Sequence, residues 1–179
     1  KKYALSSFNL QRIVVDSGNT VYDSRDNCNA VIETKTNILV AGCMNTIIPD
    51  SVIEIGAHAF DSQKGLTKLY ISKNVKKIAS SAFDVCPSIA EIVVDSANTT
   101  FDSRDNCNAI IETATNTLIK GCFNSTIPNT VTAIGDNAFY RTALSDISIP
   151  NGVKSIGENA FAVTYVKNIL IPASVSSIA

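Results

Sequence analysis

Five cysteines, a single histidine and two copies of one carboxylate pair are the residues of this 179-residue chain that could do chemistry. Nucleophilic catalysis needs a base beside a serine or cysteine, and we expect the only imidazole, His58, to be an exposed turn residue. The pairs Asp23/Asp26 and Asp102/Asp105 each enclose an arginine, and their spacing fits no calcium-binding loop. We expect salt-bridged turns there, no catalytic site, no cofactor and therefore no enzyme.

The charge of the chain excludes two classes of partner. Fifteen basic and sixteen acidic residues leave a formal charge of −1, so neither nucleic acid nor an anionic membrane surface is expected to bind. No apolar run approaches the roughly 18 residues that span a bilayer, so no direct membrane insertion is expected. Because both ends of the sequence look like interrupted repeats, we expect residues 1–179 to be a single domain from a longer array.

A long internal repeat organises the sequence. Residues 14–60 recur as residues 93–139, with 30 of the 47 aligned residues identical. The run Asp23–Ala30 returns letter for letter as Asp102–Ala109. A single catalytic pocket does not need such a run twice, whereas stacked units that meet the same environment tolerate or require it. The sequence therefore predicts a repeat array.

A shorter unit of 22 or 23 residues runs inside the long one. It is marked by Ile-Pro, by Ala-Phe and by Val-x-x-Ile, the last at Val52/Ile55, Val75/Ile78, Val131/Ile134, Val153/Ile156 and Val175/Ile178. A six-residue segment just before the Ile-Pro point is apolar at its first, fourth and sixth places, and the fourth and sixth places alternate with polar or exposed residues as in a strand. This pattern predicts five parallel strands, one per coil, at residues 10–15, 66–71, 89–94, 144–149 and 166–171.

The remainder of each unit predicts a second extended segment and a turn. Val-x-x-Ile is too short for a helix, so it is expected to form a short strand. Gly56, Gly135 and Gly157 then permit a sharp turn, and Ala-Phe fits one helical or 3₁₀ turn. The phenylalanines of these turns are expected to stack as one ladder in the core: Phe60, Phe83, Phe139 and Phe161.

The complete pattern Leu-x-x-Ile-x-Ile-Pro-x-x-Val-x-x-Ile-Gly-x-x-Ala-Phe is clearest from Leu144 to Phe161. It resembles that of the BspA-like leucine-rich repeat proteins of bacterial and some protist cell surfaces, and the resemblance covers nearly the whole chain. It implies an α/β leucine-rich-repeat solenoid, a right-handed horseshoe that is rich in β-structure, with a parallel sheet on its concave face. It also implies an exported protein that adheres to host glycoproteins or to other microbes.

Two insertions lengthen one coil of each long repeat, at about residues 16–47 and 95–126. Each contains two apolar segments around a short loop that ends in asparagine, which predicts an inserted β-hairpin. If Ile32 faces Leu39, the same register places Cys28 opposite Cys43, and Cys107 opposite Cys122 in the second copy. Either two disulfides or buried reduced thiols satisfy this arrangement. Zinc is not expected because each hairpin offers only two thiols, and Cys86 is expected to be a buried core thiol.

The outward-facing residues of the five predicted strands are the candidate binding site, here called the strand strip. They are the third and fifth residues of each strand: Arg12, Val14, Lys68, Tyr70, Glu91, Val93, Asp146, Ser148, Asn168 and Leu170. Coils about 4.8 Å apart would align the fifth places into a mostly apolar stripe with a tyrosine anchor. Exposed valines and leucines are also ordinary strand formers, which is the alternative interpretation.

Three functions remain open on these grounds. The first is a non-enzymatic extracellular repeat protein that binds a protein or glycoprotein on a host or neighbouring cell through its concave face. The second is a rigid spacer that presents another domain. The third is a glycan-binding module. The absence of a catalytic constellation argues against an enzyme, and the repetition itself specifies a scaffold rather than a partner.

Overall fold

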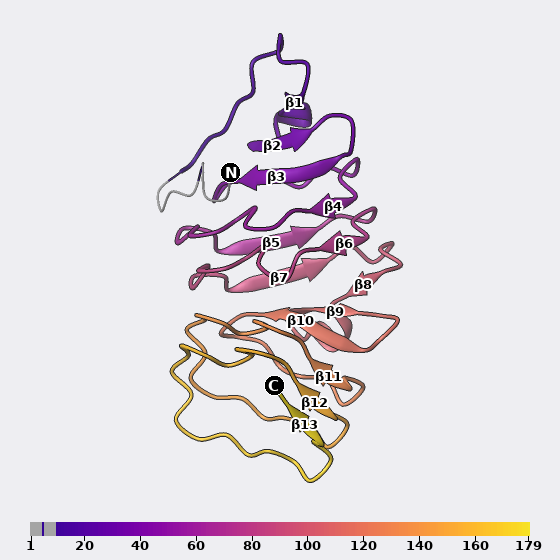
Figure 1. Ribbon diagram of the computed structural model, residues 1–179, viewed down its shortest axis with the longest axis vertical. Coiled ribbons are helices and arrows are strands. Elements are labelled where there is room, and N and C mark those ends of the chain that lie inside the picture. Colours follow the sequence, from indigo (N-terminus) through magenta and orange to yellow (C-terminus); the bar gives the residue numbers. More distant parts are fainter. Residues whose placement is uncertain (1–4, 6–9) are drawn as a thin grey trace.

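The computed structural model describes Leu5 and residues 10–179, which form a solenoid of stacked coils (Figure 1). One row of short strands runs along the stack, and every Val-x-x-Ile segment contributes one strand to it, as predicted. These strands are β4 (Glu54–Ile55), β6 (Lys77–Ile78), β11 (Ala133–Ile134), β12 (Ser155–Ile156) and β13 (Ser177–Ile178). The pairs β4/β6, β11/β12 and β12/β13 are parallel.

The second row contains fewer strands than the sequence predicts. Of the five expected strands, only β5 (Lys68–Ile71) and β7 (Glu91–Val94) form a ladder, which is parallel and in the expected register. Residues 10–15, 144–149 and 166–171 have no strand assignment. The prediction of five strands is wrong there because a strand requires a hydrogen-bonded neighbour: residues 10–15 lie beside the irregular end of the first insertion, and residues 144–149 and 166–171 form no ladder with each other.

The two insertions form strands and 3₁₀ helices of their own. The first contains β1 (Tyr22–Asp23), the 3₁₀ helix η1 (Arg25–Asn27), β2 (Ala30–Glu33) and β3 (Ile38–Gly42). The second contains β8 (Phe101–Asp102), η2 (Arg104–Asn106), β9 (Ala109–Glu112) and β10 (Thr117–Gly121). In both, the predicted antiparallel hairpin is present.

Each hairpin is built into the stack. Strand β3 pairs in parallel with β4, and β10 pairs in parallel with β11, so the second strand of each hairpin is a rung of the first row. The resulting sheets have the orders β1-β2-β3-β4-β6 and β13-β12-β11-β10-β9-β8. An insertion therefore supplies a complete extra coil rather than an excursion from an existing one.

The extra coils interrupt the strand strip. The Met44 amide donates to Leu10 O at 3.3 Å, which places the end of the first insertion beside residues 10–15. The Asn124 side chain donates to Ala90 O, which places the end of the second insertion beside β7. The prediction that Val14, Tyr70, Val93, Ser148 and Leu170 form one continuous stripe is therefore wrong.

The four phenylalanines of the Ala-Phe turns form two separate stacks. Phe60 and Phe83 have ring centroids 5.4 Å apart, and Phe139 and Phe161 have centroids 5.3 Å apart. The single ladder expected from the sequence is broken because the second inserted coil, which carries no Ala-Phe turn, lies between the pairs. The chain thus has two clusters of buried apolar residues that meet at this coil.

The sharp turns do not depend on glycine. No glycine has a positive φ, and the left-handed residues of three turns are His58, Asn137 and Asn159, two positions after the conserved glycine of the unit. Asparagine adopts this conformation at low cost. At Gly56 a Cβ atom would lie 3.1 Å from Leu39 O, so the close approach of neighbouring coils favours glycine there.

Candidate functional site

All ten residues of the strand strip are exposed, although they do not form one sheet. The alternation that placed them outward is clearest in β5 and β7, where exposed and buried residues alternate along both strands. Tyr70 is 48% exposed and Val93 is 39% exposed. Large apolar side chains on paired strands therefore face solvent, and this is the part of the strip that belongs to a strand ladder.

The β5/β7 ladder sets these side chains side by side. Tyr70 lies opposite Val93, and Lys68 lies opposite Glu91, with a Lys68 Nζ to Glu91 Oε2 distance of 2.7 Å. The Tyr70 hydroxyl donates to Asp95 Oδ2 at 2.5 Å, which holds the ring along the strand ends. The exposed ion pair contributes little to stability. Its effect is to place both signs of charge beside an apolar centre.

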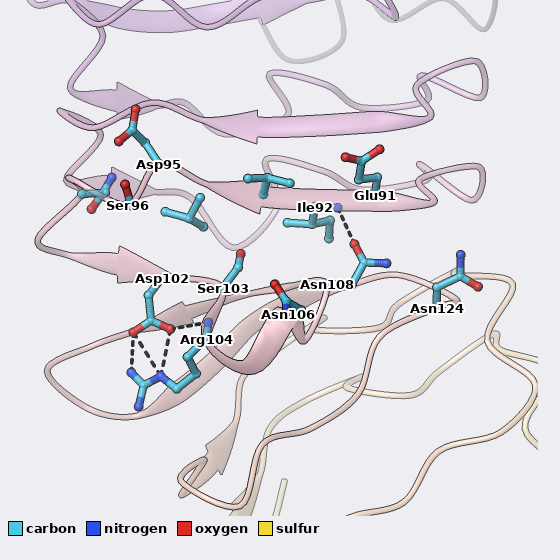
Figure 2. Close-up of a pocket in the computed structure, with 13 residues that line it drawn as sticks. Glu91, Ile92, Asp95, Ser96, Asp102, Ser103, Arg104, Asn106, Asn108 and Asn124 are labelled. Atoms are coloured by element: carbon cyan, nitrogen blue, oxygen red, sulfur yellow. Dashed lines mark hydrogen bonds and ion pairs between the residues drawn. The ribbon is translucent and has the colours of Figure 1, made fainter.

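A groove of ≈590 Å³ opens beside β7 (Figure 2). Strand β7 forms one wall, and the segment that contains η2 forms the other. Its polar lining includes Ser103, Asn106, Asn108 and Asn124 from the inserted coil. Val93 belongs to both the groove and the strand strip, so the two surfaces are continuous.

Asn108 closes the free edge of β7. The Ile92 amide donates to Asn108 Oδ1 at 2.6 Å, and Asn108 Nδ2 donates to Ala90 O at 2.8 Å, as Figure 2 shows for the first bond. A carboxamide has the donor and acceptor of a peptide group, so it can substitute for one unit of the missing neighbouring strand. Paired edges resist unwanted association with other strands.

The first long repeat has an equivalent groove of ≈550 Å³. Its polar residues Ser24, Asn27, Asn29 and Asn45 correspond to the four of the second groove. The strand wall differs, since Arg12 stands where the second groove has Glu91. The two grooves therefore share an amide-rich wall and carry opposite charge on the facing wall.

The identical run Asp23–Ala30 is explained by the geometry of this wall. Arg25 Nε and Nη2 donate to the two carboxylate oxygens of Asp23 at 2.7 and 2.6 Å, and this guanidinium holds the pKa of Asp23 well below its usual range. Asp26, Asn27 and Asn29 all have left-handed backbones. The predicted salt-bridged turn is confirmed in both copies.

All five cysteines are buried free thiols. In the first hairpin Ile32 faces Leu39 as predicted, but a β-bulge shifts the register so that Ala30 faces Gly42. The second hairpin has the same bulge. Continued past the bulge, the register no longer places the two cysteines of a hairpin opposite each other. Burial raises the pKa of Cys107 to about 11 and that of Cys86 to about 12, so these thiols are protonated at neutral pH.

His58 is placed differently from the prediction. Its side chain is only 13% exposed, and Nδ1 lies 3.9 Å from Asp84 Oδ2 of the neighbouring coil. The sequence pattern did not lead us to expect Asp84 beside His58. Alignment of the Ala-Phe turns would have placed Asp61, which lies on the turn of His58, and Asp84 at the same position of successive coils. None of these residues belongs to the strand strip or to the grooves.

The family of the chain follows from its repeats. A family model described as "BspA type Leucine rich repeat region (6 copies)" matches residues 41–125 and 108–179. The chain belongs to the BspA-type leucine-rich repeat family. Such repeats are interaction modules and are generally not enzymes. No curated protein matches the chain, and in the described part of the chain no helix has the length and apolar character needed to cross a membrane.

Solved structures of bacterial leucine-rich repeat proteins share this fold. A leucine-rich repeat protein from Eubacterium ventriosum is 25% identical, with a TM-score of 0.64 over 73% of this chain and 36% of that one. A leucine-rich cell surface protein from Faecalibacterium prausnitzii is 25% identical, with a TM-score of 0.52 over 73% and 42%. The pneumococcal vaccine antigen PcpA is 23% identical, with a TM-score of 0.59 over 71% and 39%. The chain thus spans about two-fifths of these proteins.

Proposed function

We propose that this chain is the recognition module of an exported, cell-surface protein and that it binds a protein or glycoprotein on a host or neighbouring cell without catalysis. The observation that supports this most is the exposed pair Tyr70 and Val93, held side by side on the β5/β7 ladder. Rigid aromatic and aliphatic side chains at the centre of a surface are the residues that carry most binding energy in protein interfaces.

The surroundings of this pair have the composition of an interface. Lys68, Glu91 and Asp95 supply a charged rim around an apolar centre, which is the usual arrangement in protein–protein contacts. The adjoining groove adds the amide groups of Asn106 and Asn124. Amides both donate and accept hydrogen bonds, so they suit a peptide backbone or the hydroxyl groups of a glycan.

The cell-surface part of the proposal is supported by relatives. One similar structure is a leucine-rich cell surface protein and another is a pneumococcal vaccine antigen. The described chain also has no convergent catalytic residues in either groove; Asp102 is already paired to Arg104. A recognition role therefore accounts for the exposed residues with fewer assumptions than catalysis does.

The test compares two double variants of matched size and charge. Tyr70→Asp/Val93→Asp places two carboxylates on the strand strip, and Val40→Asp/Ile53→Asp places two on exposed apolar positions in β3 and just before β4 of the first row. Binding is measured to epithelial cell monolayers and to immobilised extracellular-matrix glycoproteins, intact and deglycosylated. Circular dichroism and thermal melting establish that both variants are folded.

We expect the strip variant to lose at least about tenfold in affinity, because interface anchors of this kind contribute about 1.4 kcal/mol or more. The control variant should bind like wild type. Equal binding by both variants, or equal loss in both, would contradict a site on the strip. A wild-type chain that binds none of the probes would favour the spacer function instead.

A further inference from the structure

Two carboxylates lie at the same position of neighbouring coils. Asp61 and Asp84 each follow the phenylalanine of an Ala-Phe turn, in the turns after β4 and β6. The backbones of these turns are bonded to each other: the Phe60 amide donates to Ala82 O at 2.8 Å, and the Ser62 amide donates to Asp84 O at 3.0 Å. The stacked phenylalanine rings hold the same two turns together. The carboxylates are therefore fixed beside each other by the fold.

An imidazole completes the group. One candidate ligand atom from each of His58, Asp61 and Asp84 lies within 4.8 Å of the other two. Asp61 is 8% exposed, and the side chains of His58 and Asp84 are 13% and 21% exposed. Within residues 5 and 10–179 this is the one cluster of three such ligating residues. It is a shielded, preformed set of one nitrogen and two oxygen ligands.

The fold does not itself require this combination. In the second long repeat the residues that correspond to His58 and Asp61 are Asn137 and Tyr140. Like charges placed opposite each other on adjacent strands are destabilising, so two aspartates in stacked turns call for positive charge. Around Asp84, the like charge of Asp61 is opposed by the basic side chains of Lys120, His58 and Arg141, and a bound cation would add to the positive side of this balance.

We propose that His58, Asp61 and Asp84 bind one divalent transition-metal ion that joins two neighbouring coils. Imidazole suits zinc, copper, iron and nickel, and carboxylates suit harder ions such as manganese, so a mixed set of this kind fits Zn²⁺ or Mn²⁺. Calcium is disfavoured because it takes 6–8 oxygen ligands. The ion adds positive charge between the two carboxylates and cross-links turns that are otherwise joined by hydrogen bonds and packing.

The geometry is compatible with this ion. Zinc lies about 2.0–2.2 Å from nitrogen and carboxylate ligands, which sets neighbouring ligand atoms roughly 3–3.6 Å apart. The His58 Nδ1 to Asp84 Oδ2 distance of 3.9 Å needs only a small side-chain rotation to reach that range. Ser62 Oγ donates to Asp61 Oδ2 at 2.8 Å, which is the kind of outer contact that orients a metal-binding carboxylate. On the same turn, Gln63 is 1% exposed and its Oε1 accepts no hydrogen bond from the described residues.

The experiment titrates Zn²⁺ alone into the chelator-treated protein by calorimetry, and measures thermal melting with and without the ion. The test variants are His58→Asn and Asp84→Asn. The histidine variant preserves the backbone, because Asn137 has the same left-handed conformation in the second repeat, with φ 57° against 58°. The control is Asp146→Asn, which removes an exposed carboxylate of the strand strip. Melting of the metal-free variants establishes that each one folds.

We expect wild type and Asp146→Asn to bind about one Zn²⁺ and to melt at a higher temperature with the ion, because binding to the folded state alone raises stability. Both test variants should lose at least about tenfold in Zn²⁺ affinity, as removal of one ligand implies, together with the melting shift. No Zn²⁺-dependent shift in wild type would overturn the proposal. So would an equal shift in all four proteins, since that would place the ion on the thiols or elsewhere.

Discussion

At the scale of single residues, the copied run Asp23–Ala30 shows that identity between repeats marks backbone geometry. Three of its positions have a positive φ and are occupied by aspartate or asparagine, the residue types that tolerate this conformation best after glycine. Ser24 Oγ donates to Ala30 O at 2.7 Å, and Cys28 and Ala30 are buried. The run is preserved because it folds one wall of a groove, whatever that groove binds.

The cysteines provide a prediction at this scale. Because burial raises the pKa of all four thiols for which a shift is resolved, Cys28, Cys86, Cys107 and Cys122, the folded protein should contain little thiolate. In the folded protein near pH 8, we expect almost no reaction with a thiol reagent within minutes. In denaturant all five thiols should react. One reactive thiol in denaturant would instead support the two disulfides.

At the scale of elements, strand β7 is stabilised on its two edges by different means. On one edge it pairs with β5 through a parallel ladder. On the other, the Asn108 carboxamide replaces part of a strand. In the described part of the chain, the equivalent Asn29 side chain of the first repeat donates one hydrogen bond, to Asn45 O at 3.3 Å. The same residue thus has an edge-closing role in one copy and a minor role in the other.

The pair of copies makes this role testable. Asn108→Gly removes the carboxamide while keeping a residue that accepts a positive φ, and Asn29→Gly is the matched control. We expect the first variant to lose about 1–3 kcal/mol of unfolding free energy, because it leaves the Ile92 amide of β7 without its partner and removes the shorter of the two hydrogen bonds to Ala90 O. The control should lose less than about 1 kcal/mol. Chemical denaturation measures both, and equal losses would show that Asn108 does not stabilise the edge.

At the scale of the whole molecule, the second inserted coil joins the two apolar clusters. Ile110 of β9 belongs to the cluster that contains Phe60 and Phe83, whereas its neighbour Ile111 belongs to the cluster that contains Phe139. Strand β9 is therefore buried on both faces. In β2, the equivalent strand of the first repeat, Val31 is only half-buried. One sequence motif occupies two environments because its neighbours along the stack differ.

This difference predicts unequal effects of equivalent truncations. Ile110→Ala should cost about 2–5 kcal/mol of unfolding free energy, because it opens a cavity between the clusters. Val31→Ala removes a smaller side chain from a half-buried site and should cost less than about 1.5 kcal/mol. Denaturant titrations followed by circular dichroism measure both values. Similar losses in both variants would mean that Ile110 is not packed more tightly between the two apolar clusters than Val31 is in the first repeat.

Local sequence pattern and tertiary contacts determine different features of this structure. The 22- or 23-residue period, the short strands at Val-x-x-Ile, the core phenylalanines and the outward orientation of Tyr70 and Val93 were all predictable, because alternation and spacing are properties of the chain itself. The bulge in each hairpin, the interruption of the strand strip, the closure of β7 by Asn108 and the approach of His58 to Asp84 were decided by the stacking of coils. Each of these four features depends on which segments are neighbours in space. The repeat period does not determine those neighbours, because the position of the two inserted coils in the stack is a property of the tertiary structure.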